Sequence, residues 1–460
     1  MTHDTQGPAL KLVDGPGGPL LYDVNRVKTY ACGPGEAVLM RSAGADPGAA
    51  PAPLPATTGS ELDQARVRLA RLSRLSAQLA ETDTVDTAGN GPPSNLFMHI
   101  CRGCNLACAY CYAEGCKVQP GAAWMSEQTA RRAIDLLFAS AAPGNQRIVT
   151  FAGGEPLLHF GLIRTAVAHA ERRRRETGAG LALRLLTNGT IMDREMLDFI
   201  VRHEIFVQVS LDGPPEVHDA LRPTRRGDGS ADRILTTLRQ FKRRGYHGFR
   251  VRATLCHGNC DVARIERFYR DLGLTEFSVQ PSQCADGEAL RMDAEDLAHI
   301  AAHYAGVAGA AIARPGDAVD DLPPDLLPPL HRLRLGIKTK HFCGAGRDLL
   351  VVTPDGDLYP CPALAGDARF CIGDLDAGVH IDVGHPFRNQ RVERKRGCRN
   401  CWLRNLCGGG CVAQALRVNG DPELPDPQDC AMARARLGAA LAIHHHTVGR
   451  VNALPLTCAP

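Results

Sequence analysis

Residues 101–116 read CRGCNLACAYCYAEGC and carry Cys104, Cys108 and Cys111 at the spacing C-x3-C-x2-C. An apolar run at 96–100 comes immediately before them and predicts a β-strand, so the cysteines lie in the loop that follows a strand. Three thiolates from one short loop can bind three irons of a cubane cluster and leave the fourth iron open to a small molecule. The loop therefore predicts a metal site with an open, catalytic position.

The cysteine content of the whole chain favours bound metal over disulfides. Its 460 residues include 18 cysteines but only 13 Phe, 8 Tyr and 2 Trp. No signal peptide is visible at residues 1–11, and no run reaches the ~18 apolar residues of a membrane helix. We therefore expect a cytoplasmic protein, whose reduced thiols bind zinc or iron–sulfur clusters. Zinc stays an alternative at the first loop, where Cys101 or Cys116 could supply a fourth ligand.

Charge and pattern describe a globular chain. The formal net charge of +3 requires neither nucleic acid nor an anionic membrane as a partner. From residue 93 to about 312, strand-like apolar runs alternate with helical windows. The runs lie at 96–100, 147–152, 181–187, 205–211, 249–255 and 277–280, and the windows include 126–140 (capped by Ser126), 161–174, 193–203 and 231–244. This alternation predicts an α/β fold with a parallel sheet, a partial (β/α)6 barrel whose functional groups gather at the carboxyl ends of the strands.

Distinct motifs end the next three predicted strands. They are FAGGEP at 151–156, LTNG at 186–189 and SLDGP at 210–214, the last followed by His218, Asp219 and Arg222. Each motif by itself reads as a strand-end turn. Taken together with CNLACAYCY, however, the series resembles the radical S-adenosylmethionine (radical SAM) superfamily, whose partial barrel carries a three-cysteine loop after its first strand.

The resemblance implies a catalytic cluster and a mechanism. Cys104, Cys108 and Cys111 would bind a [4Fe–4S] cluster, and the methionine part of SAM would chelate the open iron. One electron then cleaves SAM to a 5′-deoxyadenosyl radical, which abstracts a hydrogen atom from substrate. In such enzymes the cofactors carry the hard chemistry, and the protein supplies orientation and exclusion of side reactions.

The same resemblance implies a set of SAM contacts. Gly153, Gly154 and Glu155 would receive the methionine ammonium, because glycines permit close backbone approach and a carboxylate pairs with an amine. Ser210 would contact the ribose and Arg222 the methionine carboxylate. Tyr110 either packs against the adenine or is a core aromatic residue. The full expected set is Tyr110, Gly153, Gly154, Glu155, Asn188, Ser210 and Arg222.

A second group of cysteines lies near the C-terminus. Cys343 is followed by Gly356 and Cys361, then by Cys398-x2-Cys401-x5-Cys407-x3-Cys411, and finally by Cys430. The alternative is that these cysteines bind structural zinc, since zinc ribbons also use C-x2-C pairs. The pattern resembles the SPASM extension of radical SAM peptide maturases, which implies two auxiliary [4Fe–4S] clusters and three clusters in all. The second would be bound by Cys398, Cys401, Cys407 and Cys430, and the first by Cys343, Cys361 and Cys411.

The first auxiliary site departs from fully ligated relatives. Leu349 stands six residues beyond Cys343, where some relatives carry another cysteine. Cys371 is a candidate substitute ligand; otherwise one iron is open, and a substrate thiolate could bind it. Sulfatase-maturing relatives place an acidic base next to the second cysteine, where this chain has Pro362. That difference argues against the formylglycine reaction.

The N-terminal residues predict a small module of their own. Apolar runs at 9–13, 20–23 and 26–31 predict strands, and a helix follows at 35–42. The module resembles leader-binding elements of peptide-modifying enzymes, although a packing appendage is the alternative. LLYDVN at 20–25 looks like the hairpin of maturases that install Cys thioether links. The layout is shared by maturases of Cys-rich peptides and by the maturation protein of quinohemoprotein amine dehydrogenase, which links Cys to Asp or Glu methylenes.

In linear order the chain is expected to divide into six segments. They are a peptide-recognition module (1–43), a linker and helix (44–92), the barrel (93–312), a second linker (313–340), the SPASM domain (341–435) and a C-terminal helix with a tail (436–460). The helix in the second segment is expected to start at Ser60, with Gln64 in capping-box reach, and to bury a stripe that includes Val67, Leu69 and Leu72.

We expect an enzyme that forms thioether cross-links in a small Cys-containing peptide or protein. The substrate would bind through the N-terminal module, and a donor such as flavodoxin or ferredoxin would supply electrons. One alternative is the same machinery making carbon–carbon links or epimerising a peptide. The other is a non-catalytic, metal-stabilised peptide chaperone.

Overall fold

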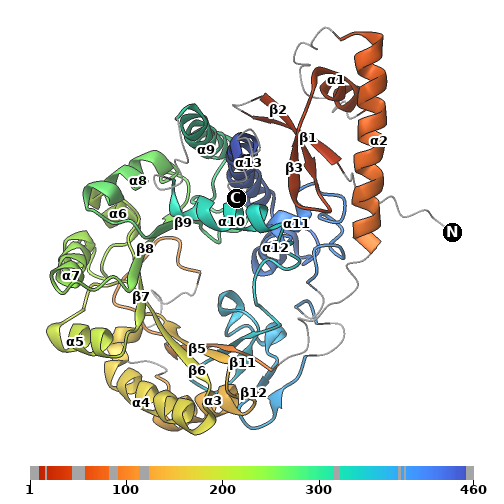
Figure 1. The fold of residues 1–460 in the computed structure, drawn as a ribbon. Helices are drawn as coiled ribbons and strands as arrows, with labels where there is room; N and C mark the ends of the chain where they lie inside the picture. The colour runs from red at the N-terminus through yellow and green to blue at the C-terminus, as the bar shows by residue number, and fades with distance from the viewer. Residues whose placement is uncertain are drawn as a thin grey trace, which may run out of the picture. The chain divides into compact units, whose positions relative to one another are not determined.

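A computed structural model describes residues 10–15, 18–43, 57–81, 92–112, 124–314, 322–381, 385–387 and 390–451. The chain forms two compact units (Figure 1). The barrel unit comprises Ala88–Asp293 and Gly344–Asn389; the helical unit comprises Met1–Thr87, Ala294–Cys343 and Gln390–Pro460. Among the described helices of both units, none combines the length and the apolar character needed to cross a bilayer.

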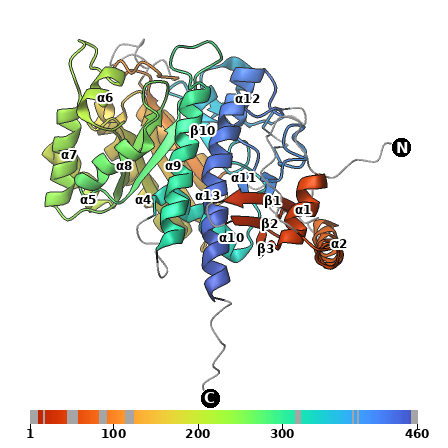
Figure 2. The same cartoon turned by 90° about the horizontal axis from the view of Figure 1, so that it is seen from above.

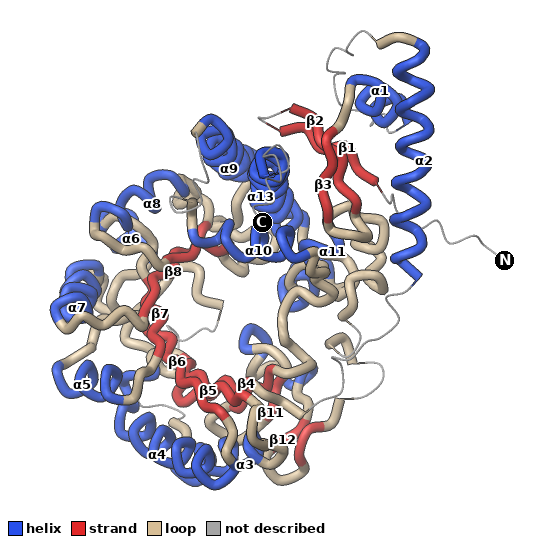
Figure 3. The backbone as a smooth tube through the Cα atoms, in the orientation of Figure 1, coloured by secondary structure: helices blue, strands red, loops and turns tan. Residues whose placement is uncertain are grey.

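The barrel unit is built on an eight-stranded sheet with the order β11-β10-β4-β5-β6-β7-β8-β9. Neighbouring strands from β4 to β9 pair in parallel, and they follow an arc with helices on its outer side (Figure 3). The bounds are β4 (Asn95–Cys101), β5 (Gln146–Gly153), β6 (Gly180–Thr187), β7 (Phe206–Ser210), β8 (Phe249–Leu255), β9 (Phe277–Pro281), β10 (Leu349–Val352) and β11 (Leu358–Tyr359). The predicted α/β partial barrel with its six strands is confirmed.

Helices cover the outer side of this sheet. They are α3 (Glu127–Phe138), α4 (Phe160–Thr177), α5 (Arg194–Arg202), α6 (Pro215–Leu221), α7 (Ala231–Arg243) and α8 (Val262–Asp271). The first three and α7 begin within one residue of the predicted windows, whereas α6 and α8 were not among the windows named from the sequence. The Ser126 side chain accepts a 3.0 Å hydrogen bond from the N–H of Thr129, which satisfies a donor that the first turn of α3 leaves free. Asp193 caps α5 in the same way. A side-chain cap thus starts α3, α5 and α8, and each of the six helices buries apolar side chains against the sheet.

One pairing was not expected from the sequence. β10 lies in the segment that the linear division assigned to the cysteine-rich region, yet it pairs in parallel with β4, from Leu349 opposite Asn95 to Val352 opposite Met98. The carbonyl of Asp348 also accepts hydrogen bonds from the N–H groups of Ser94 and Asn95. Residues 344–389 therefore fold with the barrel unit. The six segments expected from the sequence remain a prediction of how the chain divides into domains.

The helical unit contains the N-terminal module and the longest helices. β1 (Leu10–Gly15), β2 (Gly18–Asp23) and β3 (Lys28–Ala31) form an antiparallel sheet, and helix α1 (Pro34–Ala43) follows, as predicted. The remaining helices are α2 (Gly59–Glu81), α9 (Ala294–Ala313), α10 (Leu327–Leu335), α11 (Arg404–Cys407), α12 (Val412–Asn419) and α13 (Pro427–Val451). Helix α13 packs along α9 (Figure 2).

The predicted start of α2 was wrong. The capping box is formed by Thr58 and Glu61: the N–H of Thr58 donates to Glu61 Oε2 at 2.7 Å, and the N–H of Glu61 donates to Thr58 Oγ1 at 3.3 Å. A capping box needs a spacing of three residues, which Ser60 and Gln64 do not have. Leu69 and Leu72 pack against Leu10 of β1, whereas Val67 is 70% exposed and lies off the buried stripe.

Candidate functional site

The three-cysteine loop is held in place by the chain that follows α6. The N–H of Ala107 donates to the carbonyl of Pro223 at 2.8 Å, and the N–H of Ala109 donates to that of Leu221 at 2.9 Å. These bonds make the loop pair with the segment that contains Arg222. Two motifs separated by about a hundred residues of sequence therefore meet at the carboxyl end of the sheet.

The three predicted ligands converge. Burial raises the pKa of the Cys104 thiol to about 12, and the nearby Glu155 carboxylate and then Cys108 and Cys111 add to the rise, because like charges oppose ionisation. Burial also raises the pKa of Cys108, which the Arg222 guanidinium lowers in part. Thiols that repel one another as thiolates need a bound cation to ionise together, and a trio of this kind fits three irons of a cubane cluster.

Cys101 has a different role from the other cysteines of the loop. It is fully buried, and its Sγ donates to the carbonyls of Glu155 at 3.2 Å and Gly103 at 3.5 Å. This engagement with the backbone argues against Cys101 as a fourth zinc ligand. Cys116, the other candidate, lies outside the described residues.

Glycines at the end of β5 allow the loop to approach the sheet. A Cβ on Gly154 would lie 2.1 Å from the carbonyl oxygen of Gly103, and one on Gly153 would lie 2.3 Å from that of Cys101. Gly153 also has φ +129°, which favours glycine. The sequence analysis assigned the two glycines to the approach of SAM. In the structure, the close approach that they permit is that of the cysteine loop itself.

Glu155 is completely buried and joins the ends of two strands. Its Oε1 accepts hydrogen bonds from Thr187 Oγ1 at 2.7 Å and Leu157 N at 3.0 Å, and its Oε2 accepts one from Asn188 N at 2.7 Å. Burial raises its pKa to about 7, and these hydrogen bonds oppose the rise. Three donors from the chain occupy most of the carboxylate, so one lone-pair direction remains for the ammonium that the resemblance implies.

Asn188 and Ser210 lie at the ends of β6 and β7. Asn188 Nδ2 donates to Asn105 Oδ1 at 2.8 Å and lies 3.7 Å from Cys104 Sγ, so this side chain reaches the cysteine loop. Ser210 is half-buried and pairs in register with Arg252 of β8. Their contacts with SAM stay a prediction.

Asp212 is the site residue that sequence reasoning missed, although the SLDGP motif contains it. Its buried Oδ2 accepts hydrogen bonds from Tyr110 Oη and, at 2.8 Å, from Arg222 Nε. Arg222 lies over the Tyr110 ring at 5.2 Å from the centroid, and its Nη1 is 3.9 Å from Cys108 Sγ. Tyr110 and Arg222 are therefore held together by one buried carboxylate beside a predicted cluster ligand.

The four cysteines predicted for the second auxiliary cluster also converge, within the helical unit. Burial raises the pKa of Cys398 to about 12, and Cys407, Cys430 and Cys401 add to the rise. Burial raises the pKa of Cys430 to about 11, again with contributions from Cys407 and Cys401. Four neighbouring thiols fit a [4Fe–4S] cluster and also a tetrahedral zinc.

Lys395 lies among these thiols, with only 2% of its surface exposed. Its Nζ donates to the carbonyl of Gly409 at 2.9 Å. Burial lowers the pKa of Lys395, and the neighbouring Cys398, Cys411, Cys343 and Cys407 oppose that change. Cys343 and Cys411, both predicted for the first auxiliary cluster, therefore lie within electrostatic reach of the same ammonium.

The other candidate ligands of the first auxiliary cluster belong to the barrel unit. Cys361 precedes the short 3-10 helix Pro362–Leu364. Cys371 is exposed, and its Sγ donates to the carbonyl of Gly373 at 3.2 Å. Leu349 is the first residue of β10, so the sixth position beyond Cys343 carries a sheet residue without a ligand atom.

Comparison with known sequences agrees with this geometry. The model of the Radical SAM superfamily matches residues 98–271. The mycofactocin maturase MftC of Mycolicibacterium smegmatis is 27% identical over 359 residues, covering 74% of this chain and 83% of the relative. The PqqA peptide cyclase of Streptomyces rochei is 26% identical, covering 76% of this chain and 93% of the relative.

A solved structure shares the fold. Native anSMEcpe with bound AdoMet superposes with a TM-score of 0.66 at 18% identity, covering 78% of this chain and all of that one. The structural similarity extends beyond residues 98–271, which are the residues that the superfamily model matches.

Proposed function

We propose that this radical SAM enzyme, a peptide-modifying maturase, joins a cysteine sulfur to a carbon atom within a small Cys-containing peptide or protein. The thioether chemistry is supported by the sequence pattern of the cysteines predicted for the first auxiliary cluster. Cys343, Cys361 and Cys411 supply three thiols, and Leu349 occupies the position of a further ligand. A three-thiol site has room for a thiolate from the substrate.

The chain's own residues would hold three [4Fe–4S] clusters. Cys104, Cys108 and Cys111 would hold the first, which with SAM supplies one-electron chemistry that yields a 5′-deoxyadenosyl radical. In the substrate, one C–H and one S–H bond are lost and one C–S bond is formed. One hydrogen atom would leave in 5′-deoxyadenosine and the second as a proton and an electron, for which auxiliary clusters held by the C-terminal cysteines would be the acceptor.

Relatives and sequence features support a peptide as substrate. Two similar proteins are named as a mycofactocin maturase and a PqqA peptide cyclase. The sheet of the N-terminal module has β1 and β3 as edge strands, to which an extended leader peptide could add as another strand. Pro362 argues against the formylglycine reaction, although a serine-type anaerobic sulfatase-maturating enzyme of Klebsiella aerogenes is also 28% identical. We propose that the enzyme works in the cytoplasm, where thiols stay reduced, with a flavodoxin or ferredoxin as its electron donor.

Anaerobic reconstitution with iron, sulfide, SAM and dithionite tests the proposal. Candidate substrates are small Cys-containing proteins encoded beside the gene. Each thioether link is expected to remove two hydrogens and one Cys alkylation site, with formation of 5′-deoxyadenosine. The matched control is Cys108→Ala, which leaves the substrate unchanged.

Other outcomes separate the alternatives. A carbon–carbon link removes two hydrogens but keeps every alkylation site, and epimerisation leaves the mass unchanged. Absence of 5′-deoxyadenosine under all these conditions would exclude the enzymatic functions and favour a peptide chaperone.

A further inference from the structure

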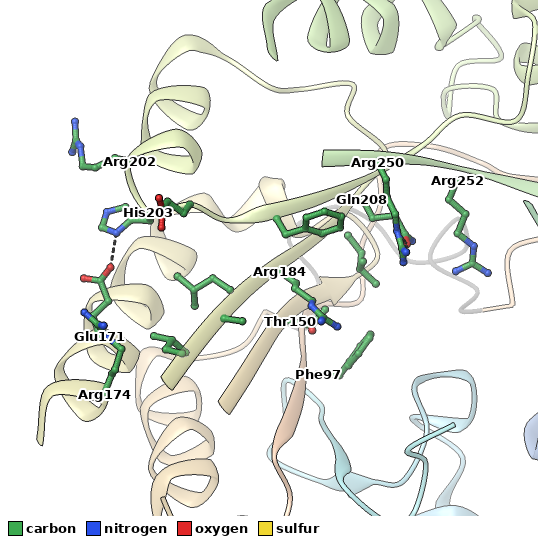
Figure 4. Close-up of a pocket in the computed structure, with 16 residues that line it drawn as sticks. Phe97, Thr150, Glu171, Arg174, Arg184, Arg202, His203, Gln208, Arg250 and Arg252 are labelled. Carbon is green, nitrogen blue, oxygen red and sulfur yellow. Dashed lines mark hydrogen bonds and ion pairs between the residues drawn. The ribbon is translucent and has the colours of Figure 1, made fainter. Parts of the chain in front are cut away.

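The barrel unit contains a cavity of about 780 Å³ that the predicted SAM contacts do not account for (Figure 4). Side chains from neighbouring strands line its inner part, among them Phe97, Thr150, Arg184, Gln208, Arg250 and Arg252. The strand register places these residues side by side: Thr150 is opposite Phe97 and Arg184, and Gln208 is opposite Arg250. The cavity thus lies on one face of β4–β8 and is lined by cationic groups.

The lining carries more cationic than anionic groups, with Arg174, Arg184, Arg202, Arg250 and Arg252 against Glu171 and Glu204. Burial lowers the pKa of Arg250; Arg252 and Arg184 lower it further, and Glu276 opposes the change. Nε and Nη2 of Arg250 both donate to Gln208 Oε1, a neutral acceptor, at 3.0 and 2.6 Å. Glu171, at the outer part of the cavity, is bound to His203 at 2.7 Å.

Two buried polar atoms in the lining lack a hydrogen-bond partner. Among the residues that the structure describes, Nε of Arg252 and Oγ1 of Thr150 are both inaccessible to solvent and unpaired. Leaving such atoms without a partner costs free energy, so a ligand that supplies acceptors would be stabilised here. A planar guanidinium donates two parallel hydrogen bonds to a carboxylate.

One residue of the lining, Arg252, lies beside the candidate catalytic site, because the strand register places it opposite Ser210. Arg252 lies within electrostatic range of Tyr112, Tyr110 and Asp212, that is, of the cysteine loop and the carboxylate that orders it. A group anchored at Arg252 is therefore close to the loop that carries the predicted SAM cluster.

We propose that this cavity binds a carboxylate of the substrate through Arg184, Arg250 and Arg252, and so places the reacting residue beside the cysteine loop. The proposal rests on the peptide substrate of the proposed function. In a peptide, the group of this chemistry is an Asp or Glu side chain or the C-terminal carboxylate.

Calorimetric titration of the anaerobic holoenzyme with short probe peptides tests this. The probes are acetyl-Cys-Gly-Glu-Gly-amide, its Gln counterpart as the amide, and the Gln counterpart with a free C-terminal carboxylate. At least one carboxylate probe is expected to bind about 10-fold more tightly than the neutral one, as for a charge-assisted pair. Preference for the Glu probe identifies a side chain as the ligand; preference for the free terminus identifies the chain end.

Variants localise the effect. Arg184→Gln and Arg250→Gln are each expected to weaken binding of the carboxylate probe about 10-fold and to leave binding of the neutral probe unchanged. The matched control is Arg239→Gln, on the exposed face of α7 and outside the cavity. Equal binding of all three probes, or a preference that survives both cavity variants, would overturn the proposal.

The readouts are independent of the proposed function. SAM cleavage to 5′-deoxyadenosine without peptide, measured beside probe binding, separates loss of substrate binding from loss of radical chemistry, and the control Arg239→Gln is expected to match wild type in both readouts. If no thioether forms with any substrate while the carboxylate preference persists, the proposed reaction fails and the carboxylate site stands.

Discussion

Arg222 Nε donates a 2.8 Å hydrogen bond to Oδ2 of Asp212, and the Asp212 side chain has no exposure to solvent. The same carboxylate accepts from the N–H of Thr254 at 2.9 Å and from Tyr110. A buried ion pair is costly to break, since its remaining partner keeps an uncompensated charge. This pair is the link between the SLDGP motif and the three-cysteine loop.

Asp212→Asn is therefore expected to lower the free energy of unfolding of the apoprotein by about 3–5 kcal/mol. The substitution keeps the shape of the side chain but leaves the Arg222 charge unpaired. Chemical denaturation followed by circular dichroism measures the change. Asp198→Asn, which removes an exposed partner of Arg244, is the control and should have little effect. Equal stability of Asp212→Asn and wild type would contradict the role given to this pair.

Gly154→Ala is expected to displace the cysteine loop. Its new Cβ would meet backbone atoms of Gly103 and Arg102, which have no room to move aside without shifting the loop. The variant should reconstitute with less iron and less charge-transfer absorbance than wild type. Gly161→Ala at the start of α4, where a Cβ meets nothing within 4 Å, is the control. Normal cluster content in Gly154→Ala would refute the close-approach argument.

The pKa of Glu155, raised to about 7 by burial, predicts a pH dependence of apoprotein stability. A carboxyl group whose pKa is higher in the folded than in the unfolded state is destabilised in its ionised form. Stability is thus expected to fall as pH rises from about 4.5 toward 7 and to level off above. Urea unfolding at a series of pH values measures this slope, which Glu155→Gln should flatten. A slope that is unchanged in the variant would assign the dependence to another group.

Lys395→Met is expected to shift the reduction potential of the auxiliary cluster at Cys398 to more negative values. The buried ammonium favours the reduced, more negative cluster, and methionine removes that charge while it keeps most of the volume. Potentiometric titration monitored by electron paramagnetic resonance measures the potential. Lys395→Arg, which retains the charge, should stay near wild type. A shift of equal size in both variants would indicate a packing effect.

Metal content separates iron–sulfur clusters from zinc. Anaerobically prepared protein is expected to hold about 12 irons and 12 sulfides per chain, as three cubanes require. Replacing Cys398 and Cys401 with serine should remove about four of each, because two of four ligands are lost. Cys32→Ser, a half-buried thiol packed on the N-terminal core, is the control. Stoichiometric zinc at the C-terminal cysteines would contradict the cluster assignment.

The barrel strands, their helices and the grouping of the cysteines were predictable because their signals are local. Apolar runs of four to seven residues mark β4 to β9, and Ser126 caps α3 at the position that its spacing predicts. Ligand spacing within a short loop is likewise a property of the chain itself. Local signals did not distinguish Thr58 from Ser60 at the start of α2, where Glu61 decides which residue caps.

Long-range relations depended on the tertiary structure. The pairing of Leu349 with Asn95 joins segments far apart in sequence, and four apolar residues carry no sign of their partner. The alternation of apolar and polar residues along a strand also does not show that Arg184 and Arg250 share a cavity. The parallel register and the curvature of the sheet bring these two residues together. The sequence by itself thus determined which residues bear the chemistry. The fold decided which of them are buried, paired or facing one another, because those properties arise only when distant segments exclude water together.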